Sequence, residues 1–384
     1  MAPKADVPFA ASLSEHPVAA SAIGEVVGDV GERLGGAPDI AVLFVTGDRT
    51  GALEDMAAAV QTILDPDALI GATAGGVLAG RRGVEERPGV ALWAARLGRR
   101  ATPLHITAEP SEEGWRFDGL PLDELERAGS LVLVADPFTT PVEDLLATVR
   151  AVNPSLPLIG GMASAARGPG GNRLLVGSRV VSHGAVGLLL DPSVSPATVV
   201  SQGCRPIGQP FTVTSAERQV ILELASRPAL DRLMETVAAL DPIERALAAQ
   251  GLLCGVVVDE QTLDFGRGDF LIRGLLGADR DAGSLAVAAE VPVGAVVQFQ
   301  VRDAATAGED LSLLLAGHEA AGALVFTCNG RGAEMFGDAS HDAGIVHGLL
   351  GGAVAGMFCA GEVGPVAGRN AIHGFTASIA LFHD

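Results

Sequence analysis

The same order of apolar runs occurs three times along this chain and limits the folds it can adopt. An apolar run from residue 40, IAVLFV, is followed by an amphipathic stretch, then by LIGATAGG and GVALWAA. The same order returns near residues 131 and 323, and Gly71, Gly160 and Gly356 stand at the same point of the second run. This alternation predicts a strand, a helix and two further strands in each unit.

The last two strands of each unit lie close enough in sequence to pair as an antiparallel hairpin across a glycine-containing turn. The sequence therefore predicts an α/β (α+β) fold, with mixed β-sheets flanked by helices and repeated strand-helix-strand-strand units in two halves. Amphipathic stretches at residues 14–35 and 228–250 are expected to cover sheet faces. The connector-like DPSVSPATVV places a domain boundary near residue 200, so residues 1–200 hold two units and residues 201–384 hold a β-rich segment and the third.

Composition excludes several classes of partner. The 384 residues include 26 basic and 46 acidic side chains, and the formal charge of −20 opposes binding to phosphate backbones or anionic lipids. We therefore expect no nucleic acid and no membrane partner. The N-terminus has no apolar run of signal-peptide length, which predicts a cytoplasmic protein. One apolar segment, residues 343–361, approaches membrane-span length, but Gly351 and Gly352 divide it into a short helix and a strand.

Common cofactor and metal motifs are absent from the sequence. The four cysteines have no CxxC pair, so neither a zinc ribbon nor a disulfide framework is predicted. Lys4 is the only lysine, which excludes a P-loop, and no GxGxxG follows a strand. The GxSxG elbow of serine hydrolases is missing around Ser164. On a helix, His341 and His347 would lie about 240° apart, so they do not face one metal ion. We expect no cofactor and no bound metal.

The candidate site is the loop FTCNGRGAEMFGDASHDA, residues 326–343. It occupies the strand-to-helix turn of the third unit, where α/β sheets collect ligands, and it is longer than the two equivalent turns. Arg331 can direct two donors at a ligand carboxylate, the helix capped by Ser340 adds backbone amides, and Glu362 can accept an ammonium group. These groups favour a small zwitterion such as an amino acid. The candidate ligand-binding residues are Asn329, Arg331, Gly332, His341, Asp342, Glu362 and His373.

Three alternatives stay open at this point. The polar side chains of the loop can satisfy one another and only tie the loop down. The protein can be a hydrolase or transferase with Cys328 or Cys359 as nucleophile and His341 or His373 as base, although a thiol at the end of an apolar strand is more often packed. A scaffold that binds other proteins and no ligand is the third reading.

Several uncommon short motifs of the sequence resemble those of the FIST family. They are GCRPIG (203–208), FTVT (211–214), RPAL (227–230), FTCNGRG (326–332), HD (341–342), CAGEVGP (359–365) and HGFTAS (373–378), together with LIGATAGG and LIGGMAS. The resemblance covers the chain from about residue 38. It implies a FIST N plus FIST C protein, a sensory module that binds small ligands such as amino acids and passes that state to a partner.

The family resemblance implies no settled catalytic residues, so the site residues above come from the sequence reading alone. We expect no output domain in the chain itself. We therefore expect a separate signalling partner or a homo-oligomer to carry the response.

Overall fold

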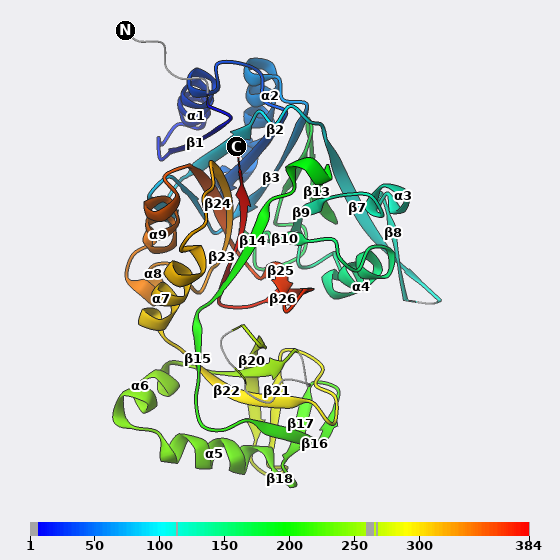
Figure 1. Ribbon diagram of the computed structural model, residues 1–384, viewed down its shortest axis with the longest axis vertical. Coiled ribbons are helices and arrows are strands. Elements are labelled where there is room, and N and C mark those ends of the chain that lie inside the picture. Colours follow the sequence, from blue (N-terminus) through cyan, green and yellow to red (C-terminus); the bar gives the residue numbers. More distant parts are fainter. Residues whose placement is uncertain (1–6, 113, 259–264, 266–267, 384) are drawn as a thin grey trace. The chain divides into compact units, whose positions relative to one another are not determined.

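The computed structural model describes residues 7–112, 114–258, 265 and 268–383. Contacts divide the chain into two compact units (Figure 1). The first comprises residues 1–200, 311–372 and 376–384, and the second comprises residues 201–310 and 373–375. The third predicted unit, from residue 323, therefore packs with residues 1–200. The domain boundary near residue 200 was drawn along the sequence, and it stays a prediction.

Three strand triples organise the first compact unit. They are β2 (Ile40–Thr46), β3 (Ala68–Ala74) and β6 (Val90–Ala95); β9 (Ser130–Ala135), β10 (Leu158–Met162) and β13 (Ala185–Leu190); and β23 (Gly322–Cys328), β24 (Ala353–Cys359) and β27 (Thr376–Phe382). In each triple the first two strands are parallel, and the last strand pairs antiparallel with the first. The predicted hairpin between the last two strands is therefore wrong, because the last strand crosses to the other side of the first.

A short hairpin fills the gap before the last strand of each triple and pairs with a different triple. The hairpins are β4 (Gly76–Ala79) with β5 (Arg82–Glu85), β11 (Leu174–Val176) with β12 (Arg179–Val181), and β25 (Glu362–Val366) with β26 (Arg369–His373). Strand β4 pairs with β24, β11 pairs with β3, and β25 pairs with β10, all antiparallel. The three triples are thus joined in a closed cycle of exchanged hairpins.

Glycine is required at the same point of each second strand. A Cβ atom added at Gly71 would lie 2.1 Å from the Leu43 carbonyl oxygen of the neighbouring strand. At Gly160 and Gly356 the corresponding carbonyl oxygen, on the first strand of the same triple, would be 1.8 Å away. No side chain fits at such distances. The glycines that mark the order of runs in the sequence therefore mark equivalent positions in the sheets.

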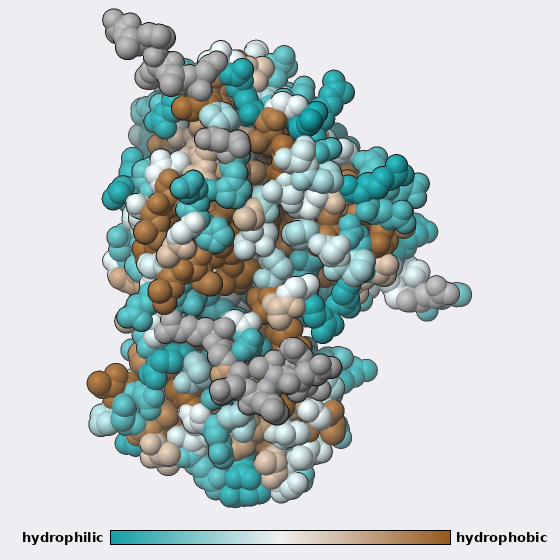
Figure 2. Space-filling model, in the orientation of Figure 1, coloured by the Kyte–Doolittle hydropathy of each residue, from teal (hydrophilic) through white to brown (hydrophobic). Residues whose placement is uncertain are grey.

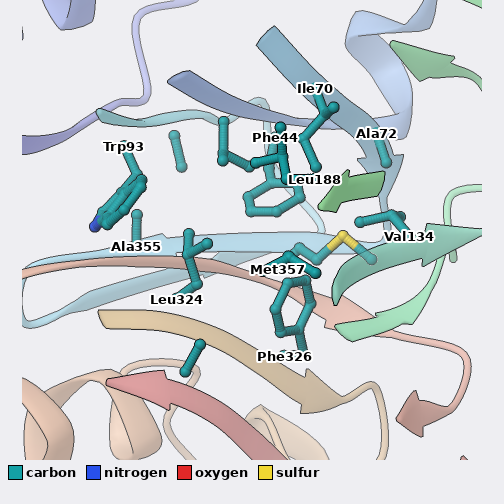
Figure 3. Packing of buried hydrophobic residues seen from close by; sticks show 14 of the residues in the cluster. Phe44, Ile70, Ala72, Trp93, Val134, Leu188, Leu324, Phe326, Ala355 and Met357 are labelled. Carbon is teal, nitrogen blue, oxygen red and sulfur yellow. The ribbon is translucent and has the colours of Figure 1, made fainter. Parts of the chain in front are cut away.

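The apolar runs are continuous because both faces of these strands are buried. In β2, Val42 and Phe44 face an inner core, whereas Leu43 and Val45 face the helices outside. The inner core draws on all three triples, with Phe44, Trp93, Val134, Leu188, Phe326 and Met357 among its members (Figure 3). Burying these large side chains at the centre holds the three sheets together.

Each sheet has its own outer cover of helices (Figure 1). The outer clusters contain residues of α1 (Ala19–Leu34) and α2 (Leu53–Leu64) on the first sheet, of α3 (Leu122–Leu125) and α4 (Val142–Val152) on the second, and of α9 (His341–Leu350) and the end of α7 (Ala304–Leu315) on the third. The sheets are extended by β1 (Phe9–Ser14), by β7 (Ala101–Ser111) with β8 (Gly114–Asp118), and by β14 (Ala197–Gln202). Two 3-10 helices, η1 (Gly47–Ala52) and η2 (Pro192–Val194), lie in turns. The predicted fold class is confirmed as mixed sheets flanked by helices.

The second compact unit contains a closed antiparallel sheet together with helices, among them the first part of α7. Its described strands are β15 (Cys204–Pro206), β16 (Phe211–Glu217), β17 (Val220–Leu224), β18 (Arg227–Pro228), β19 (Leu252–Val257), β20 (Phe270–Asp279), β21 (Ser284–Val287) and β22 (Val296–Arg302). Pairing runs β22–β16–β17–β21–β20–β19 and returns from β19 to β22. The predicted amphipathic stretch 228–250 is two helices, α5 (Ala229–Ala239) and α6 (Pro242–Gln250), because Asp241 caps a new helix whose first residue is proline.

The apolar segment 343–361 is divided as the sequence predicts. Helix α9 ends at Gly351, whose left-handed backbone closes the helix, and β24 follows directly. Among the described residues, no helix is long and apolar enough to cross a membrane. On the face shown in Figure 2, hydrophilic residues alternate with smaller apolar areas.

Candidate functional site

The second strands of the three triples end close together. Four positions after the equivalent glycines Gly71, Gly160 and Gly356 stand Gly75, Ser164 and Ala360. The Ser164 hydroxyl donates to the Phe358 carbonyl oxygen at 2.5 Å and accepts from the Gly75 backbone N–H at 2.8 Å. The Ala360 N–H donates to the Met162 carbonyl oxygen at 3.0 Å. These bonds tie all three triples together at the carboxyl ends of their strands.

Asn329 joins this group from the end of β23. Its backbone N–H donates to the Cys359 carbonyl oxygen at 2.9 Å. Its side-chain oxygen lies over Gly75, where an added Cβ atom would come within 3.3 Å of it. Gly75, Asn329 and Ala360 are exposed, and Ser164 is half-buried. We call these four residues the strand-end face.

Beneath the loop, Arg331 and Asp342 form a buried ion pair. Arg331 is 0 % exposed and Asp342 is 4 % exposed. The guanidinium donates from Nε to Oδ2 at 2.8 Å and from Nη2 to Oδ1 at 2.9 Å, and Thr327 donates to Oδ2 at 2.5 Å. Burial alone would raise the pKa of Asp342, but Arg331 and the hydrogen bonds from His341 and Thr327 hold it well below its usual range. Asp342 is therefore an anion at neutral pH.

We expected the two guanidinium donors of Arg331 to bind a ligand carboxylate, but they bind the Asp342 carboxylate instead. This arrangement matches the alternative in which polar side chains of the loop satisfy one another. His341 joins the same network, with Nδ1 3.0 Å from Asp342 Oδ1 and its ring stacked on Phe336 at a centroid distance of 3.5 Å. Arg331 and His341 therefore shape the loop from within.

The hairpin β4–β5 fixes the rest of the loop. Glu85 accepts from the Ala333 N–H at 2.8 Å, and a Cβ atom at Gly332 would lie 2.0 Å from the same carboxylate, so a side chain at position 332 would displace it. The Ser340 hydroxyl accepts from the Gly83 N–H at 3.2 Å and makes no bond that caps α9. Ser340 stands at the N-cap position of α9 as predicted, but its side chain makes no capping bond, because the hairpin uses that hydroxyl.

Glu362 is a buried carboxyl group with one incompletely satisfied oxygen. It is 0 % exposed, and its Oε2 accepts from the Thr376 N–H at 3.2 Å and the Thr376 hydroxyl at 2.8 Å. Oε1 is buried without a nitrogen or oxygen partner among the described residues. Burial raises the pKa of Glu362 to about 8, against the opposing effects of Thr376, the Cys328 thiol and Arg331. Glu362 is therefore mostly protonated at pH 7.

The two candidate nucleophiles differ in access. Cys328 is half-buried, and its sulfur accepts from the Gly330 N–H at 3.4 Å. Cys359 is buried, and burial together with the nearby Glu362 raises its pKa well above the usual value for a thiol. Of the two candidate bases, His341 directs Nδ1 at Asp342. His373 is buried and belongs to the second compact unit, whereas Cys328, Cys359 and His341 belong to the first.

Two family models match this chain over most of its length. The FIST N domain matches residues 39–227, and the FIST C domain matches residues 229–365. The chain belongs to the FIST family. FIST domains are sensory and signal-transduction domains. The strand-end face of this FIST protein takes Gly75 and Ser164 from the FIST N match and Asn329 and Ala360 from the FIST C match.

FIST relatives of nearly the same length occur in mycobacteria. The chain is 46 % identical over 377 residues to an uncharacterized protein of Mycobacterium bovis, covering 96 % of this chain and 97 % of the relative. It is 44 % identical over 380 residues to an uncharacterized protein of Mycobacterium tuberculosis, covering 97 % and 98 %.

Sequence reasoning missed several residues of the site. Gly75 and Ser164 come from the ends of second strands in the first two triples, and the order of runs could have indicated them. Glu85, Thr327 and Thr376 gave no such signal, because each acts as a partner to a residue distant in sequence or on another strand.

Proposed function

We propose that this FIST protein is a cytoplasmic sensory protein that binds a small amino acid-like ligand at the strand-end face. The observation that carries the proposal is Glu362, a buried, mostly neutral carboxyl group with one oxygen short of partners, adjacent to the half-buried Cys328. A positively charged group brought next to Glu362 would favour its ionised form. Binding of an ammonium group would therefore release a proton.

The exposed part of the face supplies groups for the rest of such a ligand. Asn329 carries both a donor and an acceptor on its side chain, and its amide is exposed. Ser164 and Gly75 present a hydroxyl and a backbone turn beside it. Because Asp342 takes the Arg331 fork, we assign the ligand carboxylate to Asn329 instead. Arg331, Asp342, Gly332 and His341 then act as positioning residues of the loop.

The same contacts favour recognition over catalysis. A cysteine nucleophile needs a lowered pKa and a base that can take its proton, and burial acts on Cys359 in the opposite direction. His341 is engaged with Asp342 and Phe336. We therefore assign signal transfer to a partner protein or to a second copy of the chain.

A thermal-shift screen against amino acids and related small carboxylates tests the proposal. A ligand at 100 times its dissociation constant adds about 2.7 kcal/mol to the free energy of unfolding. We expect one class of ligand to raise the melting temperature of the wild type. Asn329→Ala should lose that response, and Gln219→Ala, an exposed amide in the second compact unit, should retain it. Equal responses from both variants, or no stabilising ligand, would refute the assignment.

A further inference from the structure

Cys328 and Cys359 are direct neighbours on two parallel strands. In the register of β23 with β24, Cys328 pairs with Cys359. Neighbouring strands lie about 4.7–4.9 Å apart, which falls within the usual Cα···Cα range of a disulfide. Phe326 and Met357, two positions earlier on each strand, belong to the inner core, so both thiols project from the same face of the sheet.

The fold itself does not require thiols at these positions. Counted from the paired glycine of each triple, the residues equivalent to Cys359 are Ala74 and Ala163, both 0 % exposed. The residues equivalent to Cys328 are Thr46 and Asp136, so no common side chain is needed there either. A small residue suffices for packing at the end of the second strand, and only the third triple places two thiols side by side.

The surroundings favour reaction at Cys328 first. Cys328 is half-buried at the edge of the strand-end face, whereas Cys359 is buried behind it against Gly161, where an added Cβ atom would lie 2.4 Å from the Cys359 sulfur. The Gly330 N–H donates to the Cys328 sulfur, and the positive charge of Arg331 acts on Cys328. Gly330 and Gly332 flank Arg331 in the segment that follows Cys328.

We propose that Cys328 and Cys359 form an oxidation site for hydroperoxides, with Cys328 as the reacting thiol and Cys359 as the resolving thiol. In the first step the Cys328 sulfur attacks the O–O bond, giving a sulfenic acid and the alcohol, or water when the oxidant is hydrogen peroxide. In the second step the Cys359 sulfur attacks the Cys328 sulfur. The S–O bond breaks, a disulfide forms, and the hydroxyl leaves as water with the Cys359 proton. A thiol reductant returns both cysteines to thiols by thiol–disulfide exchange and is itself oxidised to a disulfide.

Oxidation of the two cysteines is separate from ligand binding, so it is tested on the protein without a ligand. The full-length reduced protein is treated with hydrogen peroxide, denatured in N-ethylmaleimide and mapped by mass spectrometry without reduction. We expect one intramolecular disulfide that joins Cys328 to Cys359, with Cys204 and Cys254 recovered as maleimide adducts. Full recovery of Cys328 and Cys359 as maleimide adducts, under conditions that oxidise free cysteine completely, would overturn the proposal.

Single variants separate the two roles. Cys359→Ala should fold, since alanine occupies the equivalent positions, and it should accumulate a sulfenic acid at Cys328 that dimedone traps. Cys328→Ala should leave Cys359 unoxidised, and Cys204→Ala should form the cross-link as the wild type does. A disulfide between any other pair, an intermolecular one, or a sulfinic acid at Cys328 with Cys359 still free would each contradict the assignment.

Discussion

At the scale of single residues, the buried pair of Arg331 and Asp342 sets the stability of the candidate site. Arg331→Ala leaves the Asp342 carboxylate buried without its guanidinium, and breaking such a pair costs about 3–5 kcal/mol. We expect a loss of that size in urea unfolding followed by the fluorescence of Trp93, which lies in the inner core. The Trp115→Phe background removes the other tryptophan.

An exposed ion pair provides the control for this measurement. Arg116 and Glu109 are 63 % and 60 % exposed, so Arg116→Ala should change the free energy of unfolding by less than about 1 kcal/mol. A loss from Arg331→Ala as small as the one from Arg116→Ala would mean that Asp342 finds other partners.

The raised pKa of Glu362 makes the free energy of unfolding fall as the pH rises, whereas the lowered pKa of Asp342 acts in the opposite direction. Its folded pKa is raised from 4.5 to about 8, so the folded state binds more protons between these values and its contribution to stability is lost as pH rises. Glu362→Gln imitates the protonated form and removes this loss. We therefore expect the variant to gain stability over the wild type from pH 5 to pH 8 in urea titrations. Exposed Glu112→Gln should show no such trend, and a difference between Glu362→Gln and wild type that is the same at both pH values would contradict the assignment.

At this scale the sequence indicated which residues gather but not what they bind. Arg331 and Asp342 were predicted because they lie in the enlarged loop, and Glu362 because it follows the next strand; six of the seven candidates lie in one compact unit. Whether Arg331 faces a ligand or Asp342 depends on side-chain directions in the folded loop, which spacing does not determine. Glu85 could not be predicted, since its contact with Ala333 joins residues far apart in the chain.

At the scale of elements, alanine substitution tests whether the three equivalent glycines are required for strand pairing. Alanine at Gly71, Gly160 or Gly356 would press a methyl group on a backbone carbonyl that cannot leave its strand. Each substitution should destabilise the first compact unit by about 1–3 kcal/mol or more, measured by the same Trp93 unfolding. Gly24→Ala is the matched control, because nothing outside the local backbone of α1 lies within 4 Å of the new Cβ and the helix should gain about 0.5–1 kcal/mol. Neutral results at all three positions would contradict the observed register.

The strands and helices were predictable, whereas their partners were not. Continuous apolar runs and amphipathic stretches indicated β2, β9, β23 and the helices that follow, because burial on both faces leaves a clear pattern. The exchange of hairpins left no such pattern. The three strands predicted in each unit did not include β4 or β11 as separate strands, and their pairing with another sheet depends on the three-dimensional packing.

At the scale of the whole molecule, the exchanged hairpins make the two matched family regions interdependent. Residues 1–200 alone would lack β24 and β25, which pair with β4 and β10. We expect this fragment not to unfold cooperatively in circular dichroism until residues 311–384 are supplied in the same cell. Residues 201–310 contain the closed sheet of the second compact unit, so that fragment should unfold cooperatively alone. Cooperative unfolding of residues 1–200 on their own would contradict the cycle.

Ligand binding at the strand-end face can be tested through the ionisation of Glu362. Calorimetric titration of the stabilising ligand at pH 7, in buffers of different ionisation enthalpy, counts the protons released on binding. Because the pKa of Glu362 is raised to about 8, the wild type should release close to one proton per ligand, and Glu362→Gln should release none and bind more weakly. Equal affinity of the two proteins with no proton released by either would contradict the claim.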